Sequence, residues 1–448
     1  MGADGRLPVA ISLAAFAIVF AAVAGPAALA FGIPSQLLFL LAGVLIVRAM
    51  MPGLGWLAPV AYGPLIGQAL GSFFLTVLWV AGGRGVWMIV AAPALVAALA
   101  WPARRLAGRF RLPATAPGDA AALAFVLLIV PLVTGLPFAH VGELGPDGQD
   151  YRAYFTADYV WRRAVVIELA KGDPLPVNPY FSGDALHYYW MPHVLSGIQY
   201  RVASSWAALD ELLLIRSVSI NAVLIAFLYG MARTFAVRPW AAAAGVAFVV
   251  VSSSFEGLYA MVDFLRNGAA IREVRNLNID AITRWWFQGI PIDGLQRLLF
   301  YQPHHIVGYG VGLIGLLAIA RRTRARDGLA FAIAGVCLGL SVAISSFAGV
   351  MLTAAAAIHE LVAVIRAVDI KRAVIHAVAA AIPLAAGTAL TFLLQYVDGG
   401  GPVVAFELNR LATRQFWWVT LLSFGPVLLL CLAALPALRQ ERRGLGIF

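Results

Sequence analysis

Charged residues are scarce in this chain. Asp, Glu, Lys and Arg together make up 12% of the 448 residues, whereas they make up about a quarter of an average soluble domain. Hydrophobic residues make up 62%, and the remaining polar surface is too small to cover a water-soluble body of this size. The composition therefore excludes an ordinary globular enzyme, a disordered protein and a nucleic-acid binder.

Cysteines and short catalytic motifs are also scarce. Cys337 and Cys431 both stand in apolar runs, as packed core thiols do, so they say nothing about the redox compartment. The chain has no GxGxxG after a strand, no phosphate-binding loop with GK[ST], no HExxH and no CxxC pair. The common nucleotide-binding and zinc-binding motifs are therefore excluded.

Long apolar runs are abundant instead, and a run of about 20 such residues is long enough for a membrane helix. Twelve runs qualify: 9–25, 33–50, 57–80, 86–102, 119–138, 209–232, 239–258, 305–320, 328–346, 347–365, 373–396 and 415–437. The first run has a signal peptide as its alternative, because Ala28-Leu29-Ala30 resembles a cleavage site. We expect an all-α, polytopic membrane protein of about 12 transmembrane helices.

The basic residues predict how these helices are oriented. Arginines and lysines cluster in the segments 104–111, 233–238, 321–326, 366–372 and 439–443. If all five segments are cytoplasmic, as the positive-inside tendency predicts, the twelve spans alternate correctly and Arg84 is the one short-loop exception. This places the protein in the cell membrane as a multi-pass protein with both termini in the cytoplasm.

The same alternation constrains the segment 187–203, which resembles a thirteenth span. A crossing there would put the basic loops on opposite sides of the membrane, so we predict an interfacial or re-entrant helix on the outer side. A full span is the alternative.

Three outer segments follow from this arrangement: 139–208, 259–304 and 397–414. They and their edges hold 16 of the 22 acidic residues. Because acidic residues are weak topology signals, this asymmetry is largely independent of the argument from the basic residues. We divide the chain into an N-terminal four-helix segment, 1–118, and a membrane core, 119–448, that carries these loops.

The first outer loop has the densest polar pattern. Between Tyr154 and Leu169 its apolar residues suit a short amphipathic, interfacial helix that places Asp158 near the membrane surface. Asp173 follows Asp158 by fifteen residues, a Pro/Asn turn comes next, and the aromatic run Leu186-His187-Tyr188-Tyr189-Trp190 completes the loop.

This layout resembles the first loop of the GT-C superfamily of integral-membrane glycosyltransferases, such as the protein mannosyltransferases and the aminoarabinose transferases of lipid A. The stretch NPYFSGDALHYYWMPHVLSG also resembles the YYY-type membrane proteins. One position departs from the pattern, because Gly183-Asp184-Ala185 stands where several members have a Lys.

The resemblance implies transfer of a sugar from a polyprenyl-phosphate-linked donor to a glycan, lipid or protein acceptor at the outer membrane face. It implies Asp158 as the general base or metal-organising carboxylate, with Asp150 as the second acid of a pair. The residues expected to bind substrate are Arg162, Arg163, Lys171, His187, Tyr188, Tyr189, Arg284, His304 and His305.

The chemistry needs these residue types whatever the family. An acceptor hydroxyl requires a carboxylate to take its proton, and a departing phosphate requires cationic groups or a divalent metal ion. The histidines either hold such a metal with nearby acids or anchor the loop at the interface. A transporter or lipid flippase, or a non-catalytic protein on the same fold, is the alternative function.

Overall fold

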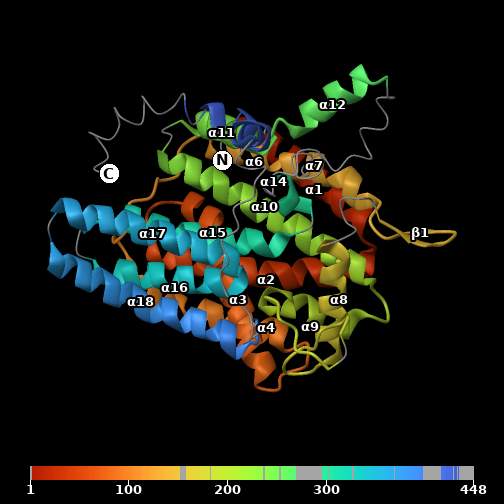
Figure 1. Cartoon of the computed structure of the whole chain (residues 1–448), viewed down its shortest axis with the longest axis horizontal. Coiled ribbons are helices and arrows are strands. Elements are labelled where there is room, and N and C mark those ends of the chain that lie inside the picture. The colour runs from red at the N-terminus through yellow and green to blue at the C-terminus, as the bar shows by residue number, and fades with distance from the viewer. Residues whose placement is uncertain are drawn as a thin grey trace.

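A computed structural model shows a bundle of α-helices with one small β-hairpin (Figure 1). It describes residues 3–151, 158–181, 183–235, 238–251, 254–268, 295–300, 302–324, 327–367, 369–396, 415–426, 428–430 and 432. The helices of the first half are α1 (Ala3–Val23), α2 (Pro26–Met50), α3 (Leu57–Val80), α4 (Met88–Ala98), α5 (Ala100–Ala103), η1 (Arg104–Leu106), α6 (Asp119–Leu127), α7 (Ile129–Ala139), α8 (Asp158–Lys171), η3 (Met191–His193) and α9 (Val194–Ala203). Those of the second half are α10 (Leu209–Phe235), α11 (Pro239–Val251), α12 (Glu256–Arg266), α14 (Leu295–Phe300), α15 (Pro303–Ala320), α16 (Gly328–Ile344), α17 (Ser346–Ala367) and α18 (Ile370–Leu393).

The all-α, polytopic membrane character predicted from the sequence is confirmed. Within the described part of the chain, nine helical segments are long and apolar enough to cross a membrane. The predicted seventh and ninth spans are shorter apolar helices, over Pro239–Val250 and Gly328–Ile344. The predicted span 415–437 falls partly outside the described residues, so the number twelve stays a prediction.

Helices α2 and α3 pack against each other through glycines. A side-chain carbon added to Gly43 would lie 1.9 Å from the carbonyl oxygen of Gly63, and one added to Gly67 would lie 2.0 Å from that of Phe39. No larger residue fits at either position, because the two backbones touch there. Such small-residue contacts are typical of helix pairs in membranes.

The basic segments gather at one end of the bundle, which we call the basic end. The backbone N–H of Arg111 donates to the carbonyl of Arg321, 2.8 Å away, and so joins the segment after η1 to the segment after α15. Arg321 donates in turn to the carbonyl of Thr234 near the end of α10, at 2.6 Å.

Glu360 connects the fourth basic segment to the same end. Its carboxylate lies 3.9 Å from Arg322 and 3.3 Å from Arg372, and it also contacts His376. Four of the five predicted basic segments therefore share one end, and the fifth lies outside the described residues.

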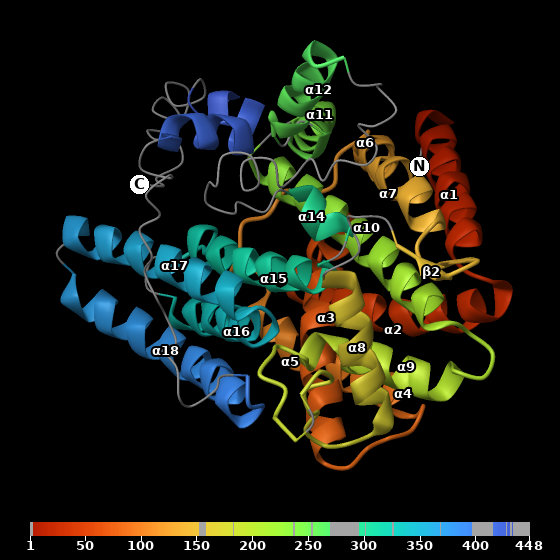
Figure 2. The same cartoon turned by 45° about the vertical axis from the view of Figure 1, so that its right-hand side comes forward.

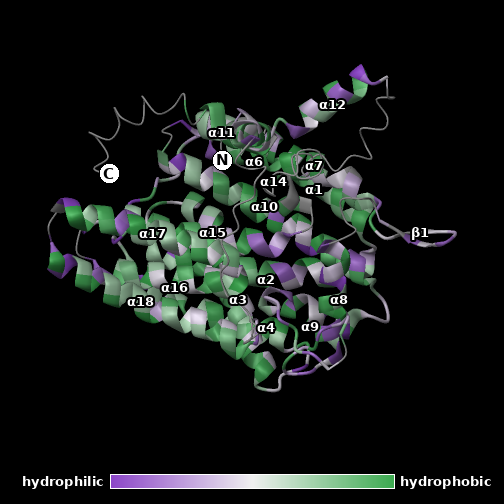
Figure 3. Ribbon diagram, in the orientation of Figure 1, coloured by the Kyte–Doolittle hydropathy of each residue, from purple (hydrophilic) through white to green (hydrophobic). Residues whose placement is uncertain are grey.

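The first loop lies at the opposite end. Figures 1 and 2 show α8 crossing that end and the hairpin of β1 (Glu143–Gly145) and β2 (Gly148–Asp150) projecting beyond it. In Figure 3 the hydrophilic colour gathers around α8 and the loop beside it, and again at the turn between α17 and α18. Tyr159, Val165, Val166 and Leu169 form the buried face of α8, so the amphipathic pattern predicted an actual helix.

The segment 187–203 does not form a span. It contains η3 and the ten-residue helix α9, which has about half the length that a membrane crossing requires. Most of α9 is buried, and Arg201 donates to the carbonyls of Ala170 and Lys171 at the end of α8, both at 2.8 Å. The segment is therefore a helix docked inside the loop end.

The apolar core is continuous across the predicted boundary at residue 118. One cluster of buried side chains extends from Val19 in α1 to Tyr396 after α18. The division into 1–118 and 119–448 remains a prediction about sequence organisation.

Candidate active site

The first helical turn of α8 carries the predicted catalytic acid. Asp158 begins the helix, where a carboxylate is favoured by the helix dipole. Its Oδ2 accepts a hydrogen bond from Nε2 of Gln302, 2.9 Å away, and Gln302 directly precedes α15. The first loop and the end of the second predicted outer loop therefore meet at Asp158.

Two tyrosines of the aromatic run contact two histidines of α15. The hydroxyl of Tyr188 lies 3.4 Å from Nε2 of His304, and the hydroxyl of Tyr189 lies 3.2 Å from Nε2 of His305. Nδ1 of His305 lies 2.7 Å from the hydroxyl of Ser345, at the start of α17. These four predicted substrate-binding residues thus form one cluster.

Two buried arginines lie beside this cluster. Arg162, one turn after Asp158 on α8, is 2% exposed and contacts Ser217 through two guanidinium nitrogens, each at 3.3 Å. Arg216, on α10, is 4% exposed and donates to the carbonyl of Pro192 at 2.7 Å. Neither guanidinium forms an ion pair with a carboxylate in the part of the chain that the structure describes.

Several polar atoms around the arginines have no hydrogen-bond partner among the residues that the structure describes. These buried atoms are Nε of Arg162, Nη1 of Arg216, Nε2 of His193, Nδ1 of His304 and Oδ1 of Asn221. An unpaired buried cation is costly, so two of them side by side require an explanation. A negatively charged ligand with several acceptor oxygens provides one, because it would satisfy both guanidiniums.

His193 lies against the same arginines and is held in its neutral form. Burial, followed by the nearby guanidiniums of Arg216 and Arg162, lowers the pKa of His193 well below its ordinary value. Burial also raises the pKa of the Tyr188 hydroxyl, and the charge of Asp158 adds to that effect. Both side chains are therefore uncharged at neutral pH.

The cluster does not fit a divalent metal ion. His193 and His304 lie with ring centroids 4.9 Å apart, and His304 and His305 with centroids 4.2 Å apart. Yet no group of three or more His, Cys, Asp or Glu side chains among the described residues has the geometry to hold a metal. The guanidiniums of Arg162 and Arg216 would also repel a cation.

Other predicted site residues are engaged elsewhere. Arg163 forms an ion pair with Asp210, with Nε and Oδ1 3.1 Å apart, and Lys171 pairs with Glu168 on the same helix. His187 is exposed, and its Nδ1 lies 2.9 Å from the carbonyl oxygen of Gln395. All three predictions therefore lack support from the geometry of the cluster.

Two further predictions cannot be compared with the structure. The backbone of Asp150 ends β2, and its side chain lies outside the described residues. Arg284 lies in the segment 269–294, which is also outside them.

The sequence interpretation missed Arg216 and Gln302. Arg216 stands within the apolar run 209–232, and an ionisable residue in a membrane span is a recognised signal of function. Gln302 carries no comparable signal, because only the folded chain brings it to Asp158. Arg84, the topology exception, donates to the carbonyl of Gly172 and so helps to close the end of α8.

Comparisons with known proteins do not identify a relative. No family model, no curated protein and no solved structure matches this chain.

The neutral state of His193 predicts a pH-dependent stability. An unfolded histidine gains a proton as the pH falls below about 6.5, whereas the buried ring in the folded protein does not. The unfolded state then binds more protons, so the free energy of unfolding should decrease by up to about 1.4 kcal/mol per pH unit below that value. Thermal melts of the purified protein between pH 8 and pH 5 measure the effect.

His193→Gln should make this slope shallower. The ring of His193 faces Arg162, Arg216, His304 and His305, so the remaining histidines account for the residual slope. Equal slopes in the wild type and His193→Gln would contradict the neutral, buried state of His193.

Proposed function

We propose that this protein is an integral-membrane glycosyltransferase that moves a sugar from a polyprenyl-phosphate-linked donor to an acceptor hydroxyl. In this proposal the basic end faces the cytoplasm, and the cluster around Asp158 works at the outer face of the membrane. The proposal includes the GT-C-like fold that the first-loop pattern resembles.

One observation carries the proposal: a carboxylate lies one helical turn from Arg162, one of two buried arginines that have no carboxylate partner among the described residues. Asp158 and Arg162 are four residues apart on α8 and therefore face the same side. Tyr188 links them, because its hydroxyl experiences the charges of both Asp158 and Arg162. A base and an anion site side by side are what phosphate displacement by a hydroxyl requires.

In the proposed reaction one bond forms, one bond breaks and one proton is transferred. The acceptor oxygen bonds to the anomeric carbon of the sugar while the bond from that carbon to the phosphate oxygen breaks. The acceptor proton moves to the carboxylate of Asp158, and the bonding electron pair leaves with the polyprenyl phosphate. Arg162 and Arg216 stabilise the negative charge that develops on the leaving oxygen.

The rival transporter function receives less support from the buried charges. A transporter needs ionisable groups at the membrane midplane, in broken helices. The Glu360 cluster lies at the basic end. The ion pair of Asp119 with Arg233, at 2.7 Å, joins the first residue of α6 to the last turn of α10 and so lies there as well.

The function can be tested without knowing the natural sugar. The purified chain, reconstituted in lipid vesicles, is offered a panel of polyprenyl-phosphate-linked sugars together with a membrane extract that supplies acceptors. Release of free polyprenyl phosphate, with the labelled sugar recovered on an acceptor, is the expected result. Vesicles that consume none of the donors, although the protein is folded, would count against the proposal.

A further inference from the structure

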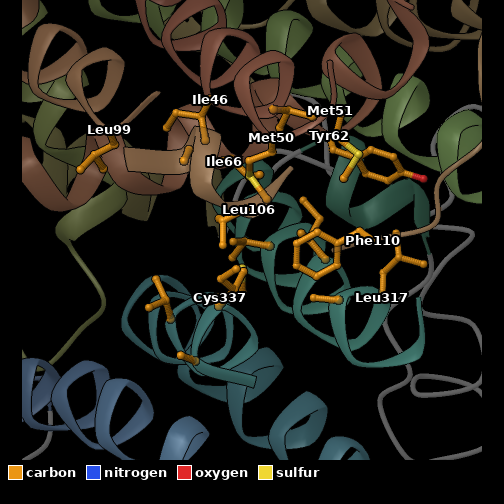
Figure 4. A pocket seen from close by; sticks show the side chains of 18 of the residues that line it. Ile46, Met50, Met51, Tyr62, Ile66, Leu99, Leu106, Phe110, Leu317 and Cys337 are labelled. Carbon is orange, nitrogen blue, oxygen red and sulfur yellow. The ribbon is translucent and has the colours of Figure 1, made fainter. Parts of the chain in front are cut away.

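A second feature of the molecule lies far from Asp158. An apolar cavity of about 560 Å³ lies between α2, α3 and α5 on one side and α15 and α16 on the other. Figure 4 shows side chains from both sides converging on it, among them Ile46, Met50, Leu106, Phe110 and Leu317. The volume is within the range of ordinary ligand sites, roughly 300–1,000 Å³.

The cavity begins at the basic end and extends into the membrane. Along α16 its lining extends from Leu329, next to the helix start, to Leu340. These twelve residues of helix span roughly 16 Å, which is about half of the 30 Å hydrocarbon core of a bilayer. The cavity thus has the depth of one leaflet.

The lining is almost entirely apolar, and two arginines stand where it reaches the basic end. Arg105 and Arg321 are the charged residues that line the cavity, and both lie at the basic end. Arg105 is exposed, and Arg321, which donates through Nη2 to Thr234, keeps a buried Nε with no hydrogen-bond partner among the described residues. No ion pair involves either side chain within the described residues, so both can face an anion.

The cavity also opens sideways toward lipid. Two of its lining residues, Leu329 and Val336, expose about two fifths of their surface, 42% and 43%. The outer faces of α17 and α18 are likewise exposed and apolar, as those of lipid-facing helices are. A membrane lipid could therefore enter without passing through water.

We propose that this cavity binds an anionic phospholipid from the leaflet at the basic end. One acyl chain fills the apolar cavity between α3 and α16, and the phosphate-bearing headgroup lies against Arg105 and Arg321. Depth, apolar lining and two arginines at headgroup level together match this ligand, because basic pockets between membrane helices recognise anionic headgroups. The proposal is independent of sugar transfer.

Native mass spectrometry of the full chain can count the bound lipid. The protein is exchanged into mixed micelles with equal amounts of phosphatidylglycerol and phosphatidylcholine, and the lipid that stays bound is identified. We expect one phosphatidylglycerol per chain, retained in preference to phosphatidylcholine.

Two pairs of variants test separately the part of the cavity that binds the acyl chain and the arginines that bind the headgroup. Val336→Trp fills the sideways opening, and Val350→Trp is its control, because Val350 is 53% exposed on α17 and does not line the cavity. Arg105→Gln removes a headgroup contact, and Arg104→Gln is its control on the same exposed turn outside the cavity.

Each outcome decides for or against the proposal. Retention should be lost in Val336→Trp and kept in Val350→Trp, and the preference for phosphatidylglycerol should fall about fivefold in Arg105→Gln alone. Equal retention in both tryptophan variants, or no preference between the two lipids in the wild type, would overturn it. So would a dimer that Val336→Trp dissociates, since the cavity would then be an interface between two chains. Thermal melts confirm that each variant is folded.

Discussion

Asp158→Asn should lower the rate of sugar transfer by about 10²- to 10⁴-fold, the range by which a positioned general base accelerates such a step. An asparagine keeps the size of the side chain and can still bond to Gln302, but it cannot take the proton of the acceptor hydroxyl. Donor binding depends on the arginine pair and should change little. The measurement is initial-rate transfer in vesicles, with donor affinity determined separately by titration.

Asp147→Asn is the matched control for this variant. Asp147 is an exposed acid of the same loop, in the turn between β1 and β2, and the substitution removes the same charge. Its transfer rate should equal that of the wild type within about twofold, since exposed surface changes have small effects. If the two variants behaved alike, Asp158 would be a solvated loop residue without a catalytic role.

Arg216→Met should separate stability from function. Arg216 is buried and pairs with no carboxylate in the described part of the chain, so its removal relieves an unpaired charge and costs one hydrogen bond to Pro192. We expect a melting temperature equal to or above that of the wild type. Transfer should fall by about 10²- to 10³-fold, as it does when one electrostatic donor to a developing anion is lost.

Arg233→Met is the control, and its expected effect on stability is opposite to that of Arg216→Met. Arg233 is equally buried, but it pairs with Asp119 at 2.7 Å, and Asp119 is fully buried. Removing Arg233 leaves an uncompensated carboxylate and should destabilise the protein by about 3–5 kcal/mol. A lower melting temperature for Arg216→Met than for Arg233→Met would mean that Arg216 is a structural residue, and the proposed anion site would lose its main support.

The sequence predicted the membrane architecture well, for identifiable physical reasons. Hydrophobic runs must cross the bilayer as helices, and basic segments prefer one side, so the gathering of 104–111, 321–324 and 366–372 at one end followed from composition alone. The same alternation of the spans correctly predicted that the segment 187–203 does not cross the membrane. Tyr188 and Tyr189 were expected in the site because the aromatic run resembles the first loop of the GT-C superfamily.

The parts of the site that the sequence did not predict depend on packing between distant segments. Arg163 resembles Arg162 in every local respect, but the helix turns Arg162 toward Ser217 in the core and Arg163 toward Asp210. Gln302 reaches Asp158 across 144 positions of sequence, which no local pattern encodes. The apolar cavity is likewise formed by helices α3 and α16, whose separate sequences look like ordinary spans.

The most direct test of the central claim is a structure of the chain with a polyprenyl monophosphate, the product that every such donor releases. We predict phosphate oxygens at hydrogen-bond distance, about 2.7–3.2 Å, from guanidinium nitrogens of both Arg162 and Arg216, with Asp158 beside the position that the sugar would occupy. A phosphate bound away from both arginines, or bound solely at Arg105 and Arg321 at the basic end, would contradict the proposed transferase site.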